Sequence, residues 1–225
     1  RLEVPQAYLL GGQSGAGKTT LHKVIGRALD GNAIVINGDA YRKRHPRFAE
    51  LQEAYGDDAV EHTALWAGKM VEALVSTLSS LGCNLVIEGT LRTAEVPLAT
   101  ARLLRERGYD VSLALMAVKP EISLVSCQLR YEQMRLAGTV PRATDPAHHR
   151  KIVDQIVENL AVLEQSGAFD DIALYDRKGG QVHPVAGVAR RASAALEDVL
   201  FGSWTEEERA HLEYLEGQLA TLRAR

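Results

Sequence analysis

The stretch GGQSGAGKTT, residues 11–20, directly follows the apolar run AYLL, residues 7–10. Gly12 to Thr19 match the pattern G-x-x-x-x-G-K-[ST], with an apolar strand pattern before them and a helical pattern after them. Glycines let backbone N–H groups surround a phosphate, and the start of a helix adds favourable charge. The stretch predicts a phosphate-binding loop (P-loop) made of Gly12, Gln13, Ser14, Gly15, Ala16, Gly17, Lys18, Thr19 and Thr20.

Two side chains of this loop are expected to act directly on a nucleoside triphosphate. Lys18 can reach the β- and γ-phosphates, and the Thr19 hydroxyl can bind Mg²⁺. The expected cofactors are therefore ATP and Mg²⁺, with GTP as an alternative to ATP.

Four more short apolar runs alternate with amphipathic segments. The runs are residues 33–37, 84–88, 111–118 and 171–176, and the helical patterns cover 19–29, 58–81, 94–107, 121–137 and the residues after Asp145-Pro146. Strands that are apolar almost throughout are typical of parallel sheets buried on both faces. The sequence predicts an α/β, P-loop kinase-like fold with a mostly parallel sheet, in one domain of residues 1–225 with its core in 7–176.

The composition of the chain limits the kinds of partner that we expect it to bind. The chain has 225 residues, 46% of them hydrophobic, and a net charge of −3. This charge argues against a nucleic-acid partner, and the apolar runs are shorter than the ~20 residues of a membrane span. The sequence begins without Met, so its start is expected to be processed or truncated, and no signal peptide is expected in it. Cys83 and Cys127 are expected to be packed thiols in a reducing, cytoplasmic compartment.

Ligands of open α/β sheets bind beyond the carboxyl ends of the strands, so polar residues there are candidates for the acceptor site. Asp39 comes two residues after the second apolar run and could orient an acceptor hydroxyl and accept its proton. Its alternative role is that of a turn residue after Gly38. Glu88 ends the third run, with Thr90 and Arg92 close behind, and could hold a magnesium-bound water or the acceptor. Its alternative role is a strand-end salt bridge.

Phosphoryl transfer also needs positive charge on the transferred group. The segment 129–144 carries Arg130, Arg135 and Arg142 around Gly138 and Pro141. This pattern predicts a helix, a turn and another helix that together form a lid, although any one arginine could simply be solvated. The adjacent pair His148-His149 is not expected to bind one metal ion, because neighbouring helical residues point about 100° apart.

Five blocks taken together resemble the zeta toxin family of bacterial toxin–antitoxin systems, whose members are UDP-N-acetylglucosamine kinases. The resemblance runs from about Tyr8 to Asp176 through GGQSGAGKTT, GDAYRKRHP, CNLVIEGTLRTAEVP, LRYEQ and RATDPAHH. It implies phosphorylation of the 3′-hydroxyl of the N-acetylglucosamine in UDP-N-acetylglucosamine. That reaction blocks peptidoglycan precursor synthesis, and a small helical antitoxin restrains the toxin.

The resemblance also implies roles for individual residues. Lys18 and Thr19 would serve ATP and Mg²⁺, Asp39 would be the base, and Arg130 and Arg142 would contact the transferred phosphate. Five residues would line the sugar-nucleotide pocket: Glu72, Glu88, Thr90, Arg92 and Thr100. For Glu72 this role rests on the resemblance alone, because its position otherwise indicates a charge on a helix surface.

Two features depart from the family pattern. Asn37 stands before Gly38 where relatives often carry an acidic residue, which alters the local charge. The tail after about residue 200 varies within the family, and Leu212, Leu215, Leu219 and Leu222 recur in it at helical spacing. Thr205 and Glu208 form a candidate capping box. We expect this tail to pack on the kinase domain rather than to bind a partner.

Two other functions stay open at this point. One is a different small-molecule P-loop kinase, such as one that modifies an antibiotic, in which Glu72 and Thr100 would be idle. The other is a nucleotide-dependent switch without chemistry, which has no need of lid arginines that stabilise a transition state.

Overall fold

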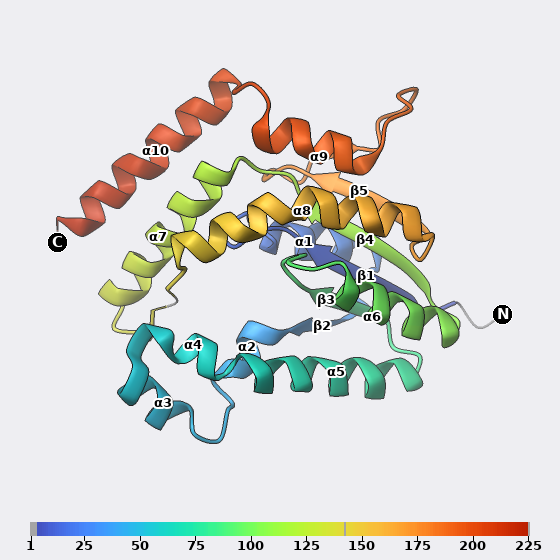
Figure 1. The fold of residues 1–225 in the computed structure, drawn as a ribbon, viewed down its shortest axis with the longest axis horizontal. Coiled ribbons are helices and arrows are strands. Elements are labelled where there is room, and N and C mark those ends of the chain that lie inside the picture. The colour runs from blue at the N-terminus through green and yellow to red at the C-terminus, as the bar shows by residue number, and fades with distance from the viewer. Residues whose placement is uncertain (1–3, 142, 225) are drawn as a thin grey trace.

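The computed structural model of the chain describes residues 4–141 and 143–224. A six-stranded sheet in the order β2-β3-β1-β4-β5-β6 runs through its centre (Figure 1). All neighbouring strands are parallel except β6, which is antiparallel to β5. The strands are β1 (Gln6–Gly11), β2 (Ile34–Asn37), β3 (Leu85–Glu88), β4 (Asp110–Met116), β5 (Asp171–Tyr175) and β6 (Gln181–His183). The mostly parallel sheet is thereby confirmed, and β6 was not predicted.

Helices connect the strands and cover both faces of the sheet (Figure 1). They are α1 (Thr19–Ala28), α2 (Gly38–Arg42), α3 (Phe48–Tyr55), the 3-10 turn η1 (Gly56–Asp58), α4 (Ala59–His62), α5 (Ala64–Ser80), α6 (Glu95–Glu106), α7 (Pro120–Leu136), α8 (Pro146–Ser166), α9 (Ala192–Phe201) and α10 (Glu206–Arg223). The single crossovers between parallel strands bring the carboxyl ends of β1, β2 and β3 to one edge.

Successive side chains of each strand point to opposite faces of the sheet, so the hydrophobic core has two layers. Leu9 and Leu113 face one layer, which α5, α6, α8 and α9 complete. Leu10 and Met116 face the other layer, together with buried residues of α1, α7 and α10. Most of the sheet is therefore buried on both faces, as the continuous apolar runs predicted, although Ile34 and Val35 of the edge strand β2 are 40% and 45% exposed.

The predicted helix over 58–81 is wrong in one respect, because the chain breaks at Thr63. The segment folds as η1, α4 and α5 in succession, and the Asp58 side chain makes no capping hydrogen bond. The side chain of Thr63 is fully buried, and its hydroxyl donates to the carbonyl of Ala59 at 2.9 Å. A hydroxyl that bonds back to the preceding turn competes with the helical pattern, which is consistent with the break.

Other helix ends follow the sequence signals. Asp145 accepts from the backbone N–H groups of Ala147 and His148, which caps α8 with Pro146 in its first turn. Thr205 and Glu208 form the expected capping box of α10. The two cysteines are free thiols, Cys127 buried and Cys83 partly buried. None of the described helices is long and apolar enough to cross a membrane.

Helix α10 packs against α7 and belongs to the core. Leu215 and Leu219 are buried in the same cluster as Leu10 of β1 and Leu21 of α1. The buried ammonium of Lys119, just before α7, donates to the carbonyl of Gly202 at 2.7 Å in the link between α9 and α10. The tail therefore packs on the rest of the chain, as the leucine spacing predicted.

Leu219→Ala should lower the free energy of unfolding by about 2–5 kcal/mol, because it removes buried apolar volume and leaves a cavity. Leu65→Ala is the matched control, because Leu65 on α5 is 73% exposed. Urea denaturation followed by circular dichroism measures both. Equal small effects in the two variants would show that α10 is not part of the cooperative core.

Candidate active site

The loop between β1 and α1 has a conformation that depends on glycine. Gly12, Gly15 and Gly17 have φ angles of 132°, 78° and 98°, which side chains disfavour. At Gly15 a Cβ atom would lie 1.9 Å from the carbonyl oxygen of Ser123, on α7. The loop is therefore pressed against α7, and residue 15 must be glycine for that contact.

The ammonium of Lys18 lies over this loop. It donates to the carbonyls of Gly12, at 2.8 Å, and Gln13, at 3.3 Å. Burial lowers the pKa of Lys18, and the negative charges of Glu88 and Asp39 oppose that shift. Arg130 adds a smaller push in the same direction as burial. Lys18 therefore lies within electrostatic reach of Asp39, Glu88 and Arg130.

Other helices hold the loop from behind. Nε2 of the buried His149, on α8, lies 2.9 Å from the Ser123 hydroxyl, and its ring also contacts the backbone of Ser14. Burial lowers the pKa of His149. Nε2 of Gln13 donates to the carbonyl of Val118 at 2.8 Å. His149 thus packs the P-loop against α7, and the described residues contain no cluster of three or more His, Cys, Asp or Glu suited to a metal ion.

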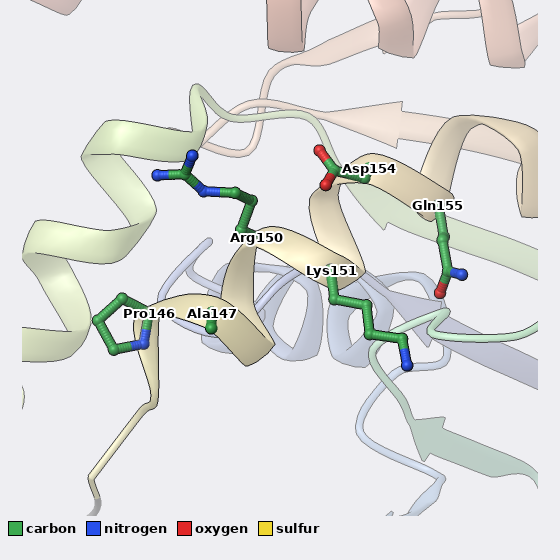
Figure 2. Close-up of a pocket in the computed structure, with 6 residues that line it drawn as sticks. All are labelled: Pro146, Ala147, Arg150, Lys151, Asp154 and Gln155. Atoms are coloured by element: carbon green, nitrogen blue, oxygen red, sulfur yellow. The ribbon is translucent and has the colours of Figure 1, made fainter.

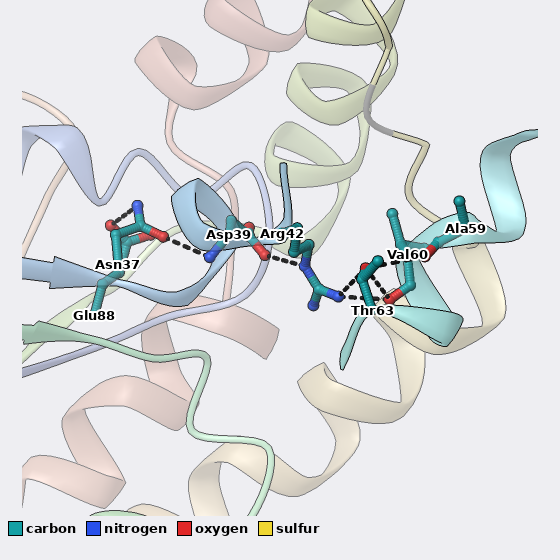
Figure 3. A network of polar contacts seen from close by, with 7 residues as sticks. All are labelled: Asn37, Asp39, Arg42, Ala59, Val60, Thr63 and Glu88. Atoms are coloured by element: carbon teal, nitrogen blue, oxygen red, sulfur yellow. Dashed lines mark hydrogen bonds and ion pairs between the residues drawn. The ribbon is translucent and has the colours of Figure 1, made fainter. Parts of the chain in front are cut away.

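Glu88 and Asn37 end neighbouring strands and are hydrogen-bonded to each other. The Asn37 amide donates to Oε2 of Glu88 at 2.9 Å, and its oxygen accepts from the backbone N–H of Asp39 at 3.0 Å (Figure 3). Nε2 of His22 lies 3.0 Å from the same Glu88 oxygen, although the ring nitrogen is not aligned for a hydrogen bond. Asn37 therefore both caps α2 and links Asp39 to Glu88.

A cavity of about 400 Å³ opens in front of these residues. Its lining includes Ser14 of the P-loop, Asp39, Thr90, Arg92 and Arg130. The link between α7 and α8 closes one side through Val140, Pro141, Ala143 and Thr144, within the predicted lid. The described lid residues therefore border the predicted acceptor site.

Several predicted residues lie elsewhere. Neither Glu72 nor Thr100, both described by the structure, lines this cavity: Glu72 is exposed on α5, and the Thr100 hydroxyl donates to Val96 of its own helix at 3.0 Å. Arg135 donates to Glu132 at 2.7 Å on the outer side of α7. Arg142 lies outside the described residues.

Sequence reasoning missed Arg177, which braces the P-loop. Its guanidinium donates to the carbonyl of Gly15 at 3.2 Å and to the hydroxyl of Ser126 at 2.8 Å. Its own carbonyl accepts from the Thr20 hydroxyl at 3.1 Å. Arg177 follows the carboxyl end of β5, so the strand-end rule that singled out Asp39 could have found it.

A second hollow, of about 450 Å³, lies along the exposed side of α8 (Figure 2). Six residues of this one helix line it: Pro146, Ala147, Arg150, Lys151, Asp154 and Gln155. Figure 2 shows the side chains of Arg150, Lys151 and Asp154 pointing in different directions rather than toward a common point. The first cavity, bordered by the P-loop and the strand ends, is therefore the candidate active site.

Comparison with known proteins agrees with this assignment of a P-loop site. The model of the zeta toxin family matches residues 1–185. The toxin PezT of Streptococcus pneumoniae is 46% identical over 219 residues, which cover 97% of this chain and 87% of PezT. The toxin zeta of Streptococcus pyogenes is 42% identical over 81% of this chain, and the match spans 64% of that toxin.

The fold is shared with a solved structure from the PezAT chromosomal toxin–antitoxin system of Streptococcus pneumoniae. The two superpose with a TM-score of 0.89 and 43% identity, over 99% of this chain and 88% of the other. The agreement in sequence extends well beyond the P-loop, and the agreement in fold includes α9 and α10. The chain therefore belongs to the zeta toxin family and has its kinase-like, nucleotide-binding fold.

Proposed function

We propose that this protein is the toxin of a toxin–antitoxin system and acts as a UDP-N-acetylglucosamine kinase. It transfers the γ-phosphoryl group of ATP to the 3′-hydroxyl of the N-acetylglucosamine. The observation that carries the proposal is that Ser14 of the P-loop, Asp39 and Arg130 line one cavity, while the Lys18 ammonium is hydrogen-bonded over the same loop. A phosphate-binding loop with its cation, next to a cavity lined by a candidate base and a second cation, suits phosphoryl transfer to an alcohol.

The donor site uses the P-loop. Backbone N–H groups of the loop would hold the phosphates of ATP, and the Lys18 ammonium would leave the carbonyls of Gly12 and Gln13 for the β- and γ-phosphates. The exposed Thr19, at the start of α1, offers a hydroxyl for Mg²⁺. This sparse donor set fits Mg²⁺, which usually keeps several waters and shares the phosphates. When bound, Mg²⁺ supplies charge neutralisation on the phosphate oxygens.

Asp39 would orient the acceptor hydroxyl and take its proton. The acceptor oxygen forms a bond to the γ-phosphorus while the bond from that phosphorus to the bridging oxygen breaks, and ADP leaves. In a loose transition state the alcohol loses its proton late, so a carboxylate is a sufficient base. Arg130, whose Nε atom is buried with no hydrogen-bond partner among the described residues, would neutralise the transferred group. Arg142 has the same proposed role.

The charge of the cavity supports an acceptor that carries phosphates. Arg42, Lys43, Arg92 and Arg130 line it, against the carboxylates of Asp39, Glu61 and Asp145. Within it Thr90 and Arg92 would bind the sugar nucleotide, with Glu88 just behind. The proposed roles of Glu72 and Thr100 rest on the family resemblance, because both lie outside the cavity.

That placement also favours a second candidate function, a P-loop kinase for another small alcohol, in which Glu72 and Thr100 are idle. The family assignment favours the first. It likewise supports a small helical antitoxin as partner and action in the cytoplasm, because the match includes a protein of the PezAT toxin–antitoxin system.

Incubation with ATP, Mg²⁺ and a panel of UDP-sugars, followed by mass spectrometry, tests the proposal. We expect one added phosphate on UDP-N-acetylglucosamine. Phosphorylation of a different alcohol would select the second candidate. ATP hydrolysis without a phosphorylated product would point to a nucleotide switch.

Lys18→Ala should abolish phosphorylation, because it removes the cation that faces the β- and γ-phosphates. Product formation and growth inhibition after induced expression give the readouts. Lys23→Ala, at an exposed position of α1, is the control and should retain full activity. Wild-type turnover in Lys18→Ala would contradict the P-loop assignment.

Arg130→Ala should lower kcat strongly, on the order of 10³-fold, with a smaller effect on the KM for ATP, because the guanidinium acts on the charge of the transition state. Arg135→Ala, the matched control on the same helix, removes an arginine that pairs with Glu132. Steady-state kinetics separate the two parameters. A rise in KM with kcat intact would make Arg130 a ground-state clamp.

Asp39→Asn keeps the shape of the side chain and removes its charge and basicity. Phosphorylation should fall by about 10²–10⁴-fold, while ATP affinity and thermal stability stay near wild type. The two measurements are made on the same variant. A rate within a few-fold of wild type would transfer the role of base to Glu88, and a parallel loss of ATP–Mg²⁺ binding would make Asp39 part of the metal site.

A further inference from the structure

Asp39 lies on a helix that is too short to be stable by itself. Helix α2 has five residues, Gly38–Arg42, and isolated helices of that length are unstable in water. The direction of the Asp39 carboxylate therefore depends on what its neighbours hold in place. Asn37 fixes the backbone by accepting from the N–H of Asp39 at 3.0 Å. The carboxylate itself meets Arg42, whose Nε donates to Oδ1 at 2.9 Å.

The other end of the Arg42 guanidinium is anchored across the cavity wall (Figure 3). Its Nη1 atom donates to the carbonyl of Val60, in α4, and to the hydroxyl of Thr63 at 3.3 Å. Thr63 is fully buried at the break between α4 and α5. A planar guanidinium with donors at both ends thus spans from the half-exposed Asp39 carboxylate to the buried Thr63 hydroxyl.

We propose that Arg42 is a positioning residue, which holds the Asp39 carboxylate in the orientation that the acceptor hydroxyl requires. This inference rests on the proposed function, in which Asp39 faces that hydroxyl. It also gives a role to the helix break at Thr63, because the break leaves the Val60 carbonyl and the Thr63 hydroxyl in contact with Arg42.

Stabilisation of the fold does not explain why Arg42 pairs with Asp39. The side chain of Asp39 is 52% exposed and that of Arg42 26% exposed, and ion pairs so close to solvent contribute little to the stability of a fold. Alignment is worth more, because a misplacement of about 1 Å can cost about 10²-fold in rate. The larger effect of Arg42 is therefore expected on catalysis.

Arg42 also lines the cavity, so its alternative role is to bind the acceptor's phosphates directly. The two roles differ in kinetics. A positioning residue acts on kcat, whereas a phosphate-binding residue acts mainly on the KM for the acceptor. The contacts of both Nε and Nη1 within the protein favour positioning.

The test compares Arg42→Ala, Arg42→Lys and Thr63→Val with the control Arg44→Ala, an exposed arginine two residues along the chain. For each, kcat and KM are measured with ATP and UDP-N-acetylglucosamine. Arg42→Ala should lower kcat by about 10–100-fold with both KM values within about twofold of wild type. Lysine should not restore kcat, because one ammonium cannot span both ends. Thr63→Val should lower kcat less, and Arg44→Ala should match wild type.

A double-mutant cycle identifies the residue through which Arg42 acts. In the Asp39→Asn background, Arg42→Ala should cause little further loss, because the carboxylate it orients is gone. Thermal unfolding shows whether Arg42→Ala folds as well as wild type. If it does not, Thr63→Val provides a milder variant.

Three outcomes would overturn the inference: unchanged kcat in both Arg42 variants, a raised acceptor KM with kcat intact, or additive losses in the cycle. Each of these requires a wild-type protein that phosphorylates the UDP-sugar. Absence of product from wild type would instead overturn the proposed function, and the inference with it.

Discussion

The candidate site depends on one close contact, that of the P-loop with helix α7 at Gly15. A side chain at residue 15 would overlap the carbonyl of Ser123, so the loop can lie flat against α7 only with glycine there. The same helix carries Arg130 toward the cavity and continues into the predicted lid. This packing contact therefore fixes the position of the P-loop relative to Arg130. His149 and Arg177 reinforce it from α8 and from the end of β5.

The parts of the fold that could be predicted are those whose signal is local. The five parallel strands are apolar almost throughout, and the P-loop carries its own backbone requirements, so both can be recognised without knowledge of the tertiary structure. The break at Thr63 could not, because the apolar spacing is helical on both sides of it. What selects the break is burial of Thr63 and its contact with Arg42, a partner 21 residues away. Such a contact leaves no periodic signal in the sequence.

The residues of the candidate site also divide into those that a simple rule predicts and those that depend on tertiary contacts. The rule that ligands bind beyond the carboxyl ends of parallel strands found Asp39, Glu88, Thr90 and Arg92, because the rule depends on topology alone. It gave no means to choose among the arginines of the lid, where spacing alone did not separate Arg130, at the cavity, from Arg135, paired with Glu132. For Asn37, the structure gives the amide group two contacts. Only an amide can donate to Glu88 while it accepts from Asp39, whereas a carboxylate there would face Glu88 with like charge.

The charges of the site are arranged for a ligand with several negative charges. Burial disfavours the charged ammonium of Lys18, and the like charge of Arg130 adds to that effect. Glu88 and Asp39 offset part of the cost, but Glu88 is shared with Asn37 and His22, and Asp39 is held by Arg42. A triphosphate at the loop would supply the remaining negative charge in a partly desolvated place, where electrostatic interactions are strong. In the proposed function, bound nucleotide would thereby offset the unfavourable burial of Lys18, while Asp39 would face the acceptor.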